Sequence, residues 1–284
     1  MNKSIKVLIS LCVVVLSATV LIFSIETKPA GTAPVQQQDA RFNVLLLGCD
    51  ESGVRTDSIM LVGVDEAAER ISLLSIPRDS KVTLNGQTHK INSALVYADM
   101  DEMKRQISQL TGASVDYYIM IKTGVFEKLV DALDGVEYTV EQDMRYSDPS
   151  QNLYINLKAG EQTLNGAQCE QYCRYRRYVM GDLTRTQHQQ KLLSAFLRQK
   201  MNLKYVLKLP TVYNILKENA QTDITPAVAA QNLALVKKLS DGATQIQNLD
   251  TPGQYNDMKK EGVSYYLIDQ KELQALCKIY YKTL

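Results

Sequence analysis

The chain has 284 residues, 45% of them hydrophobic and 22% charged, with 32 Lys and Arg against 31 Asp and Glu. A formal charge of +1 excludes a polycation that coats nucleic acid by charge alone, and the ordinary composition excludes a mostly disordered or fibrous chain. The length suits one large domain or two small ones.

An uncharged, mostly apolar segment lies near the N-terminus, at residues 7–25. As a helix it would be about 28 Å long, close to the thickness of a bilayer's hydrocarbon core. Lys3 and Lys6 precede it and the first acid is Glu26, which predicts a single-pass anchor in the cell membrane with residues 1–6 cytoplasmic. The alternative is a cleaved signal peptide, although the run is long for one and no clear A-x-A site follows. Both alternatives put the rest of the chain outside the cytoplasm.

Residues 26–40 are rich in Pro, Gly, Ala and Gln and have no periodicity, so they predict a flexible stalk. No composition shift divides the remainder convincingly. We therefore expect one extracytoplasmic domain over residues 41–284.

The first half of this domain alternates predicted strands and helices. Continuous apolar runs indicate buried strands, and Asn85-Gly86 indicates a hairpin after residues 81–84. Apolar residues spaced four and three apart predict an amphipathic helix over residues 96–110, with Gly112 as its stop signal. The further strands are expected at residues 42–47, 58–64, 71–76, 117–121 and 136–140, and a second helix at 125–133.

The second half is predicted to be mainly helical. Thr184 to Gln187 has the form of a capping box, which predicts that a helix opens there. The other expected helices are at residues 165–177, 203–241 and 271–281, with a strand at 263–268. Strands interleaved with helices predict an α/β fold, a layered α-β-α domain with a central mixed sheet.

The cysteines carry little information. Cys12 falls in the predicted anchor, and the four others permit three disulfide pairings. Cys169 and Cys173 have helical i, i+4 spacing, which is too wide for an unstrained bridge. We expect buried free thiols at the four positions outside the anchor, Cys49, Cys169, Cys173 and Cys277. The two histidines, His89 and His188, lack the spacing of zinc ligands.

Four arginines fall within twelve residues, at Arg174, Arg176, Arg177 and Arg185. Arginine binds phosphate through two parallel N–H bonds, which lysine cannot do. Arg185 is also expected in the first turn of a helix, where free N–H groups favour an anion. The cluster predicts a phosphate site; a solvated face with surface ion pairs is the alternative.

A loop with two carboxylates follows the first predicted strand. Asp50 and Asp57 flank Gly53, with Arg55 beside them. Two carboxylates at the end of a strand can share one hard divalent cation and leave its other positions for water and phosphate oxygens. The alternative is an ordinary polar turn.

A third cluster follows Pro77, which ends a strand and directs Arg78 and Asp79 to the edge of the sheet. Lys90, after the hairpin, can reach the same rim. The alternative is an internal Arg78–Asp79 pair that closes the loop.

Five segments in order resemble the LytR–CpsA–Psr proteins of bacterial envelopes. They are LLLGCDESGVRTDSIM (45–60), SIPRDSKV (75–82), KINSA (90–94), LVDALDGVEYTV (129–140) and LNGAQCEQYCRYRR…GDLTRTQHQQ. The resemblance covers roughly residues 41–200, and the predicted anchor in front also matches. Each motif alone is weak, but the ordered set is specific.

The resemblance implies a membrane-tethered phosphotransferase that moves a glycopolymer from a polyprenyl-pyrophosphate carrier onto peptidoglycan. It implies Mg²⁺ held by Asp50 and Asp57, and no nucleic-acid partner. We expect the catalytic residues to be Arg78, Asp79 and Asp57, with Asp79 or Asp57 accepting the hydroxyl proton. The expected pyrophosphate ligands are Arg55, Arg78, Lys90, Arg174, Arg176, Arg185, His188 and Gln189.

Two departures from the family pattern bear on activity. His188 stands where the family has an arginine, which predicts weaker or pH-dependent pyrophosphate binding. Tyr97-Ala98-Asp99 replaces glycines after the K-I-N-x-A motif and predicts an altered rim. Two other functions remain open: a hydrolase of pyrophosphate lipids, and a non-catalytic or regulatory protein that binds them.

Overall fold

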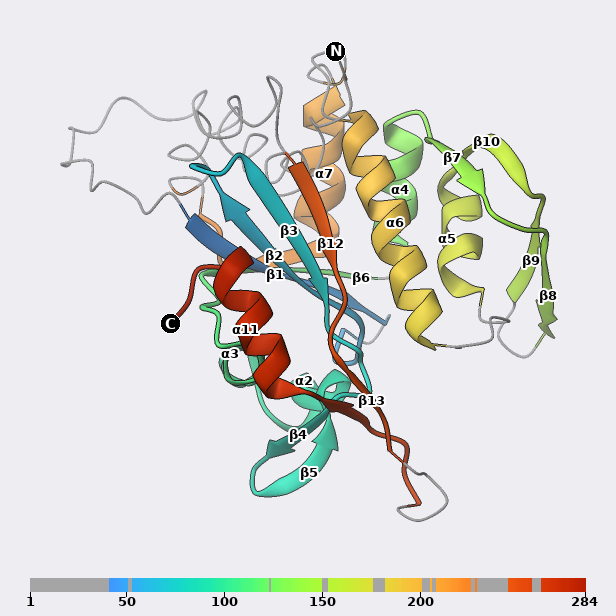
Figure 1. Cartoon of the computed structure of the whole chain (residues 1–284). Helices are drawn as coiled ribbons and strands as arrows, with labels where there is room; N and C mark the ends of the chain where they lie inside the picture. Colours follow the sequence, from blue (N-terminus) through green and yellow to red (C-terminus); the bar gives the residue numbers. More distant parts are fainter. Residues whose placement is uncertain are drawn as a thin grey trace, which may run out of the picture. The chain divides into compact units, whose positions relative to one another are not determined.

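The computed structural model describes most of the chain beyond the predicted stalk (Figure 1). The described residues are 41–50, 53–122, 124–149, 153–175, 182–200, 205, 208–225, 228, 245–256 and 262–284, without the side chains of 182–186, 197 and 209. The predicted anchor and stalk lie outside these residues. Within them, no helix is long and apolar enough to span a membrane.

The described chain folds into two compact units. We call them the sheet unit (described residues within 41–122, 220–224 and 245–284) and the helical unit (described residues within 124–219 and at 225 and 228). The chain passes between the units several times. No composition shift marks these passages, which is why the sequence shows no boundary.

The sheet unit is built on a six-stranded mixed sheet in the order β11-β6-β1-β2-β3-β12. The pair β1–β6 and the pair β3–β12 are parallel, and the other neighbours are antiparallel. The strands are β1 (Arg41–Cys49), β2 (Thr56–Asp65), β3 (Arg70–Ser75), β6 (Tyr117–Lys122), β11 (Ala220–Thr222) and β12 (Gln245–Leu249). The three apolar runs at 42–47, 58–64 and 71–76 are confirmed as strands, and the central mixed sheet is confirmed with them.

Helices α3 (Met100–Thr111) and α11 (Gln270–Tyr280) cover one face of this sheet (Figure 1). Met103 and Ile107 of α3, and Leu273 and Cys277 of α11, share a buried cluster with the strands. Gly112 ends α3 in the left-handed conformation, as predicted. The second helical layer of the α-β-α prediction stays a prediction.

The remaining elements of the sheet unit are small. The hairpin β4 (Lys81–Leu84) and β5 (Gln87–Lys90) turns at Asn85-Gly86, and both turn residues have positive φ, as its sequence predicts. A short 3₁₀ turn η1 (Ile91–Ser93) and α2 (Ala94–Tyr97) follow the hairpin. Strands β13 (Gly253–Tyr255) and β14 (Tyr266–Ile268) form a second small ladder.

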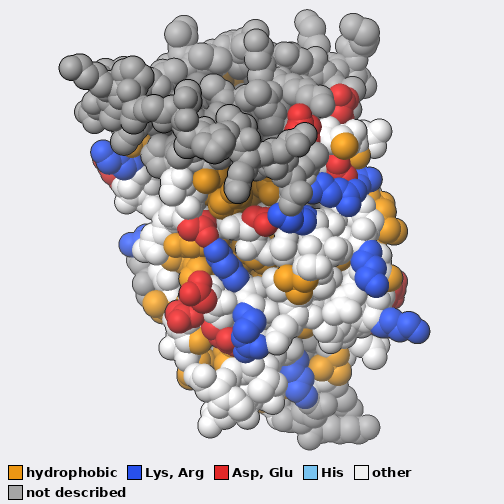
Figure 2. All heavy atoms as spheres, turned by 90° about the vertical axis from the view of Figure 1, so that its left-hand side faces the viewer, with side chains coloured by type: hydrophobic (Ala, Val, Ile, Leu, Met, Phe, Trp, Pro, Cys, Tyr) orange, Lys and Arg blue, Asp and Glu red, His pale blue; other side chains and the backbone are white. Residues whose placement is uncertain are grey.

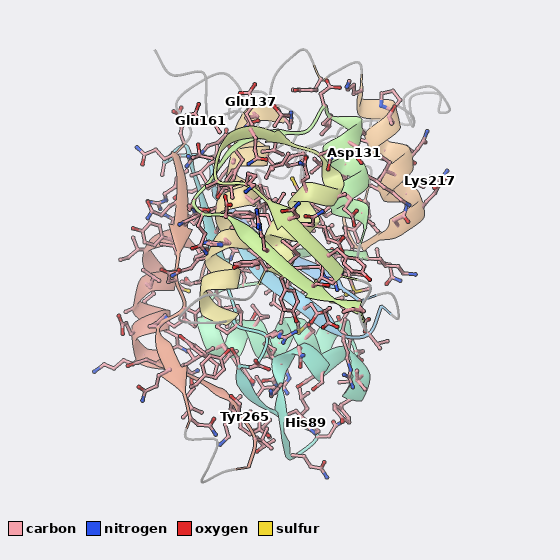
Figure 3. The ribbon with its side chains drawn as sticks, turned by 90° about the vertical axis from the view of Figure 1, so that its right-hand side faces the viewer. His89, Asp131, Glu137, Glu161, Lys217 and Tyr265 are labelled. Carbon is pink, nitrogen blue, oxygen red and sulfur yellow. The ribbon has the colours of Figure 1, made fainter. Side chains whose placement is uncertain are left out.

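The helical unit contains helices and two two-stranded ladders, β7–β10 and β8–β9. Asp131 of α4, labelled in Figure 3, accepts a 2.7 Å hydrogen bond from the backbone N–H of Gly166, and this bond ties α4 to the start of α5. The elements are α4 (Val125–Ala132), β7 (Val136–Val140), β8 (Met144–Asp148), β9 (Leu153–Leu157), β10 (Gly160–Leu164), α5 (Gly166–Arg174), α6 (Asp182–Lys200) and α7 (Leu209–Asn219).

Several predicted boundaries are wrong. The helix expected over residues 96–110 is two helices, because the backbone is extended at Ala98 and Asp99 caps α3 by accepting from the N–H of Glu102. Helix α6 begins at Asp182, so Thr184 is not its N-cap. Strands β8, β9 and β10 were not predicted: β8 and β10 have few apolar residues, and the alternating apolar residues of β9 span only five positions.

The four cysteines among the described residues form no disulfide; Cys49, Cys169 and Cys277 are buried and Cys173 is partly buried. This confirms free thiols at the four described positions. The molecular face drawn in Figure 2 carries basic and acidic side chains interspersed, in line with the near-zero net charge.

Candidate active site

The predicted carboxylates and arginine of the first two motifs meet at one edge of the main sheet. Because β1, β3, β6 and β12 all run in the same direction, their carboxyl ends lie at this edge, and β2 starts there. Ligands of open α/β sheets commonly bind outside the carboxyl ends of the strands. We call Asp50, Asp57, Arg78, Asp79 and Lys90, which cluster there, the rim cluster.

A β-bulge directs Asp57 out of the ladder. Gly48 pairs with Ser58, but Cys49 pairs with Thr56, so Asp57 is an extra residue without a partner across β1. A bulge bends the strand locally and turns the side chain of the extra residue to a new direction. The side chain of Asp57 is about half exposed, at 54%.

The Asp57 carboxylate forms an ion pair with Arg78, with Nη1 to Oδ1 at 2.7 Å. The guanidinium of Arg78 is mostly covered, and its backbone carbonyl accepts a 3.1 Å bond from the N–H of Asn92. The KINSA motif (90–94) thereby fixes the backbone of the SIPRDSKV motif (75–82). A fixed guanidinium at a sheet edge is suited to bind a phosphate through two donors.

Asp79 and Lys90 form the second ion pair of the rim cluster, at 2.8 Å. The carbonyl of Asp79 accepts from the N–H of Tyr266, and Ile91 donates to the carbonyl of Ser80. Asp79 is the more sheltered acid, with its side chain 15% exposed. Its position is thus set by segments far apart in the sequence.

The loop that carries Asp50 is closed by its own hydrogen bonds. The N–H of Asp50 donates to the carbonyl of Arg55, and the N–H of Gly53 donates to Asp50 Oδ1 at 3.1 Å. Gly53 has φ of +75°, a conformation that favours glycine. Arg55 is exposed on this loop.

The buried thiol of Cys49 is affected by the negative charges of Asp50 and Asp57 on the neighbouring loop. Burial, and then the negative charges of Asp50 and Asp57, raise the pKa of its thiol to about 12. Cys49 is therefore a protonated, 2% exposed core residue and not a nucleophile.

The described residues fit Mg²⁺ only in part. Among them, no three His, Cys, Asp or Glu side chains gather as a metal site. Mg²⁺ is commonly held by one or two carboxylates and completed by water and substrate phosphates, so two acids are sufficient when the substrate is bound. Asp50 and Asp57 are the residues that would hold it.

Sequence reasoning missed one residue of this edge, Lys122. It is the last residue of β6 and lies in register with Cys49. Its Cε is 3.8 Å from the position that a Cβ on Gly53 would occupy, so its chain runs beside the carboxylate loop. No local signal in the sequence could have found Lys122, because its place at this edge depends on the parallel pairing of β6 with β1.

The other predicted phosphate ligands belong to the helical unit. Arg174, the last residue of α5, forms a 3.1 Å ion pair with Glu170 one turn earlier. Glu127 lies near both: burial and the charges of Glu170 and Asp131 raise its pKa, whereas Arg174 lowers it. Arg176 and Arg177 lie outside the described residues, as does the side chain of Arg185 in α6.

His188 packs inside the helical unit. Its ring stacks on Tyr172 at 5.2 Å between centroids, and its side chain is 8% exposed. Burial lowers the pKa of His188, and Lys191 lowers it further, whereas Glu141 at 4.0 Å opposes this shift. The imidazole is thus neutral at pH 7.

A hydrogen-bonded chain surrounds the histidine. The hydroxyl of Tyr172 donates to Glu141 at 2.9 Å and lies 2.8 Å from the hydroxyl of Tyr138. Gln189, the next predicted ligand, donates to the carbonyl of Cys173 at 3.4 Å. These contacts explain how His188 is held, and they leave its predicted role toward a pyrophosphate as a prediction.

The structure therefore brings five predicted residues together in the rim cluster and places Arg174, His188 and Gln189 in the other unit. Basic and acidic side chains thus meet at the carboxyl edge of the mixed sheet of an α/β protein, where such sheets commonly bind ligands.

Comparison with known proteins makes the assignment specific. The chain belongs to the LytR_cpsA_psr family, whose model matches residues 14–282. This confirms the family inferred from the motifs.

Curated relatives are moderately similar. The regulatory protein MsrR of Staphylococcus aureus (strain COL) is 32% identical over 194 residues, which cover 66% of this chain and 58% of MsrR. The polyisoprenyl-teichoic acid–peptidoglycan teichoic acid transferase TagT of Bacillus subtilis (strain 168) is 26% identical over 248 residues, 84% of this chain and 75% of TagT. The chain thus spans just over half the length of MsrR.

Solved structures share the fold. TagT bound to LIIa-WTA has a TM-score of 0.69 and 25% identity and covers 85% of this chain and 90% of its own. Bacillus subtilis TagV has a TM-score of 0.72 and 24% identity, with 86% of this chain and 97% of its own chain covered.

Proposed function

We propose that this protein transfers a glycopolymer from a polyprenyl-pyrophosphate carrier to peptidoglycan, forming a phosphodiester and releasing polyprenyl phosphate. The observation that carries the proposal is the Arg78–Asp57 pair, set on a bulge at the carboxyl edge of the sheet. TagT and TagV, which share the family and the fold, are named teichoic acid–peptidoglycan transferases.

Phosphoryl transfer requires positioning and neutralisation of charge more than covalent help from the protein. In the proposed reaction an acceptor hydroxyl attacks the phosphorus that bears the glycan. A P–O bond forms to the acceptor, and the bond from this phosphorus to the bridging oxygen breaks. Polyprenyl phosphate leaves with the electron pair.

Within this scheme Arg78 binds the phosphoryl oxygens, supported by Arg55 and Lys90. The family resemblance further implies Arg174, Arg176, Arg185, His188 and Gln189 as pyrophosphate ligands. A guanidinium fixed before the substrate arrives stabilises developing negative charge without reorganisation. Mg²⁺ bound by Asp50 and Asp57 would supply further neutralisation of the pyrophosphate.

We assign the acceptor's proton to Asp79. Asp57 is paired with Arg78 and would also hold the metal, whereas Asp79, paired with Lys90, would have no metal to hold. Anchoring through residues 7–25, with the domain outside the cytoplasm, would keep the enzyme near its two membrane-proximal substrates.

The test is a transfer assay with the full chain, a lipid-linked glycan and Mg²⁺, with and without peptidoglycan. Acceptor-dependent attachment supports transfer, and release of glycan phosphate without acceptor supports the hydrolase alternative. Removing Mg²⁺ with a chelator is expected to abolish turnover.

The matched variants are Arg78→Ala and Arg145→Ala. Arg78→Ala is expected to lower kcat/KM by about 10²-fold or more, as for loss of one preorganised charge donor. Arg145 is exposed on β8, outside the rim cluster, and its loss should leave turnover unchanged. Equal activity of wild type and Arg78→Ala would contradict the site.

A regulatory protein that binds envelope lipid without turnover is the second candidate. It is favoured by the similarity to MsrR, which is named a regulatory protein, and by the neutral His188 in place of a family arginine. Lipid binding without attachment or release in the same assay would select it.

A further inference from the structure

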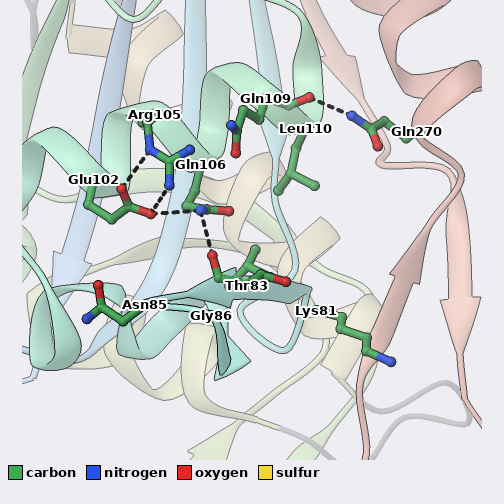
Figure 4. A pocket seen from close by; sticks show the side chains of 11 residues that line it. Lys81, Thr83, Asn85, Gly86, Glu102, Arg105, Gln106, Gln109, Leu110 and Gln270 are labelled. Atoms are coloured by element: carbon green, nitrogen blue, oxygen red, sulfur yellow. Dashed lines mark hydrogen bonds and ion pairs between the residues drawn. The ribbon is translucent and has the colours of Figure 1, made fainter. Parts of the chain in front are cut away.

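A polar groove opens between the hairpin β4–β5 and helix α3, within the sheet unit (Figure 4). Its volume is about 950 Å³, and the residues that line it come from the hairpin, α3 and the start of α11. Sites for small ligands commonly measure about 300–1,000 Å³. The groove is therefore large enough for more than one sugar ring.

The groove wall holds fixed polar groups. Glu102 and Arg105 form a two-pronged ion pair, and Gln106 donates to Glu102 at 2.8 Å and to the carbonyl of Thr83 at 3.0 Å. Gln109 lies one turn further along α3, and its side-chain amide makes no hydrogen bond to any described residue. Together the held amide of Gln106 and the amide of Gln109 offer donors and acceptors, which is what a ligand rich in hydroxyls requires.

Tyrosine rings stand near both ends of the hairpin wall. The ammonium of Lys81 lies 5.5 Å from the ring centroid of Tyr265. At the turn, Asn85 donates to the carbonyl of Tyr97, whose half-exposed ring lies 4.1 Å from the His89 ring between centroids, tilted by 34°. Figure 3 shows His89 and Tyr265 at the same end of the sheet unit. Such rings present an apolar face with a polar rim, to which the C–H face of a sugar can pack.

The charge of the groove argues against a polyanion or a bare phosphate. Glu102 and Arg105 neutralise each other, so the wall carries a net charge of about +1 from Lys81. A nearly neutral, amide-lined wall suits sugars with few charges.

The hairpin links the groove to the rim cluster. Lys81 of the groove is the cross-strand partner of Lys90, and Lys90 binds Asp79. Residues paired across a hairpin project from the same face. A polymer lying in the groove can therefore reach the rim cluster along the hairpin.

We propose that this groove binds a stretch of hydroxylated sugars adjacent to the reacting end. The inference rests on the proposed function for the identity of the sugar chain, which belongs either to the acceptor or to the transferred polymer. Both share one chemistry: linked pyranose or polyol units with many hydroxyl groups.

The test measures binding of two lipid-free probes to the full chain in detergent micelles by titration calorimetry. The acceptor arm uses N-acetylglucosamine–N-acetylmuramic acid oligosaccharides, and the donor arm uses teichoic acid released from its lipid. The groove variant is Gln109→Ala with Lys81→Ala, and the control is Gln247→Ala with Lys278→Ala, an exposed pair outside the groove.

The groove variant is expected to raise the Kd of one probe about tenfold, with the control unchanged. The probe that responds identifies the source of the sugar. The inference is overturned when wild type binds neither probe, when the groove variant binds like wild type, or when the control loses binding equally. This binding assay contains no lipid donor, so it does not depend on transfer. If the groove binds a probe but the wild-type protein shows no transfer activity, the proposed function is refuted and the groove inference stands.

Discussion

At the scale of single residues, His188 shows how burial sets chemistry. The sequence predicts a weakened phosphate ligand, because an arginine is replaced by an imidazole that is largely neutral at pH 7. The structure adds a stacked Tyr172 and a carboxylate at 4.0 Å. Burial therefore favours the neutral imidazole of His188, whereas the nearby Glu141 favours its charged form.

The lowered pKa of His188 has a consequence for stability. In the window below the unfolded value of 6.5, the unfolded chain binds a proton that the folded chain does not. The contribution of His188 is therefore present above pH 6.5 and is lost as the pH falls through the folded pKa.

We expect His188→Gln, which cannot titrate, to lose less stability on acidification than wild type. The measurement is thermal unfolding of both proteins at pH 7.5 and pH 5, and the difference between the two shifts isolates this residue. Identical shifts would contradict a depressed pKa. His89, which is more exposed, offers the control substitution His89→Gln.

At the scale of elements, sequence patterns predicted those features that depend only on residues close together in the chain. The buried runs of β1, β2 and β3, the Asn85-Gly86 turn and the glycine stop at Gly112 follow directly from sequence. The parallel pairing of β1 with β6 does not, because nothing local specifies which strands become neighbours. Lys122 was missed for this reason.

The candidate site likewise combines residues that the sequence predicts with contacts that it does not. The motifs predict Asp57 and Arg78 as site residues, but not that they bind each other, since that contact depends on a bulge that inserts one residue into β2. Strands β8 to β10 were not predicted because β8 and β10 have few apolar residues and the alternation in β9 is only five residues long.

Gly166 tests the packing between α4 and α5. A Cβ there would lie 2.4 Å from the carbonyl oxygen of Glu127, a backbone atom that cannot rotate away. We expect Gly166→Ala to destabilise the protein by about 2–3 kcal/mol, in the range of overpacking. Denaturant unfolding measures this cost.

Gly86→Ala is the matched comparison. Its φ is +75°, but a Cβ there meets nothing within 4 Å, so only backbone strain of about 1 kcal/mol is expected. An equal cost at both glycines would refute close packing at Gly166.

At the scale of the whole molecule, the last helix completes the core of the sheet unit. Leu273, Cys277 and Tyr281 are at most 1% exposed, and a Cβ on Gly63 would lie 2.6 Å from the Tyr281 ring. Each such buried side chain contributes about 2 kcal/mol, against a typical domain stability of about 5–15 kcal/mol.

We therefore expect a chain that stops at Asp269 to lose cooperative unfolding and to aggregate. Size-exclusion chromatography and circular dichroism measure both effects. A chain that lacks just its last residue, Leu284, which is 83% exposed, should behave as wild type. A soluble, cooperative protein ending at Asp269 would show that α11 is dispensable.

The hydrogen bonds of Asn43 also bear on when the sheet unit can finish folding during synthesis. Its side chain donates to the carbonyl of Lys282 at 2.7 Å and accepts from the N–H of the same residue, across 239 positions. Contacts of such long range form late and slow the folding rate. A ribosome must pass residue 282 before the first strand finds its last partners, so the sheet unit matures only after translation of this segment is finished.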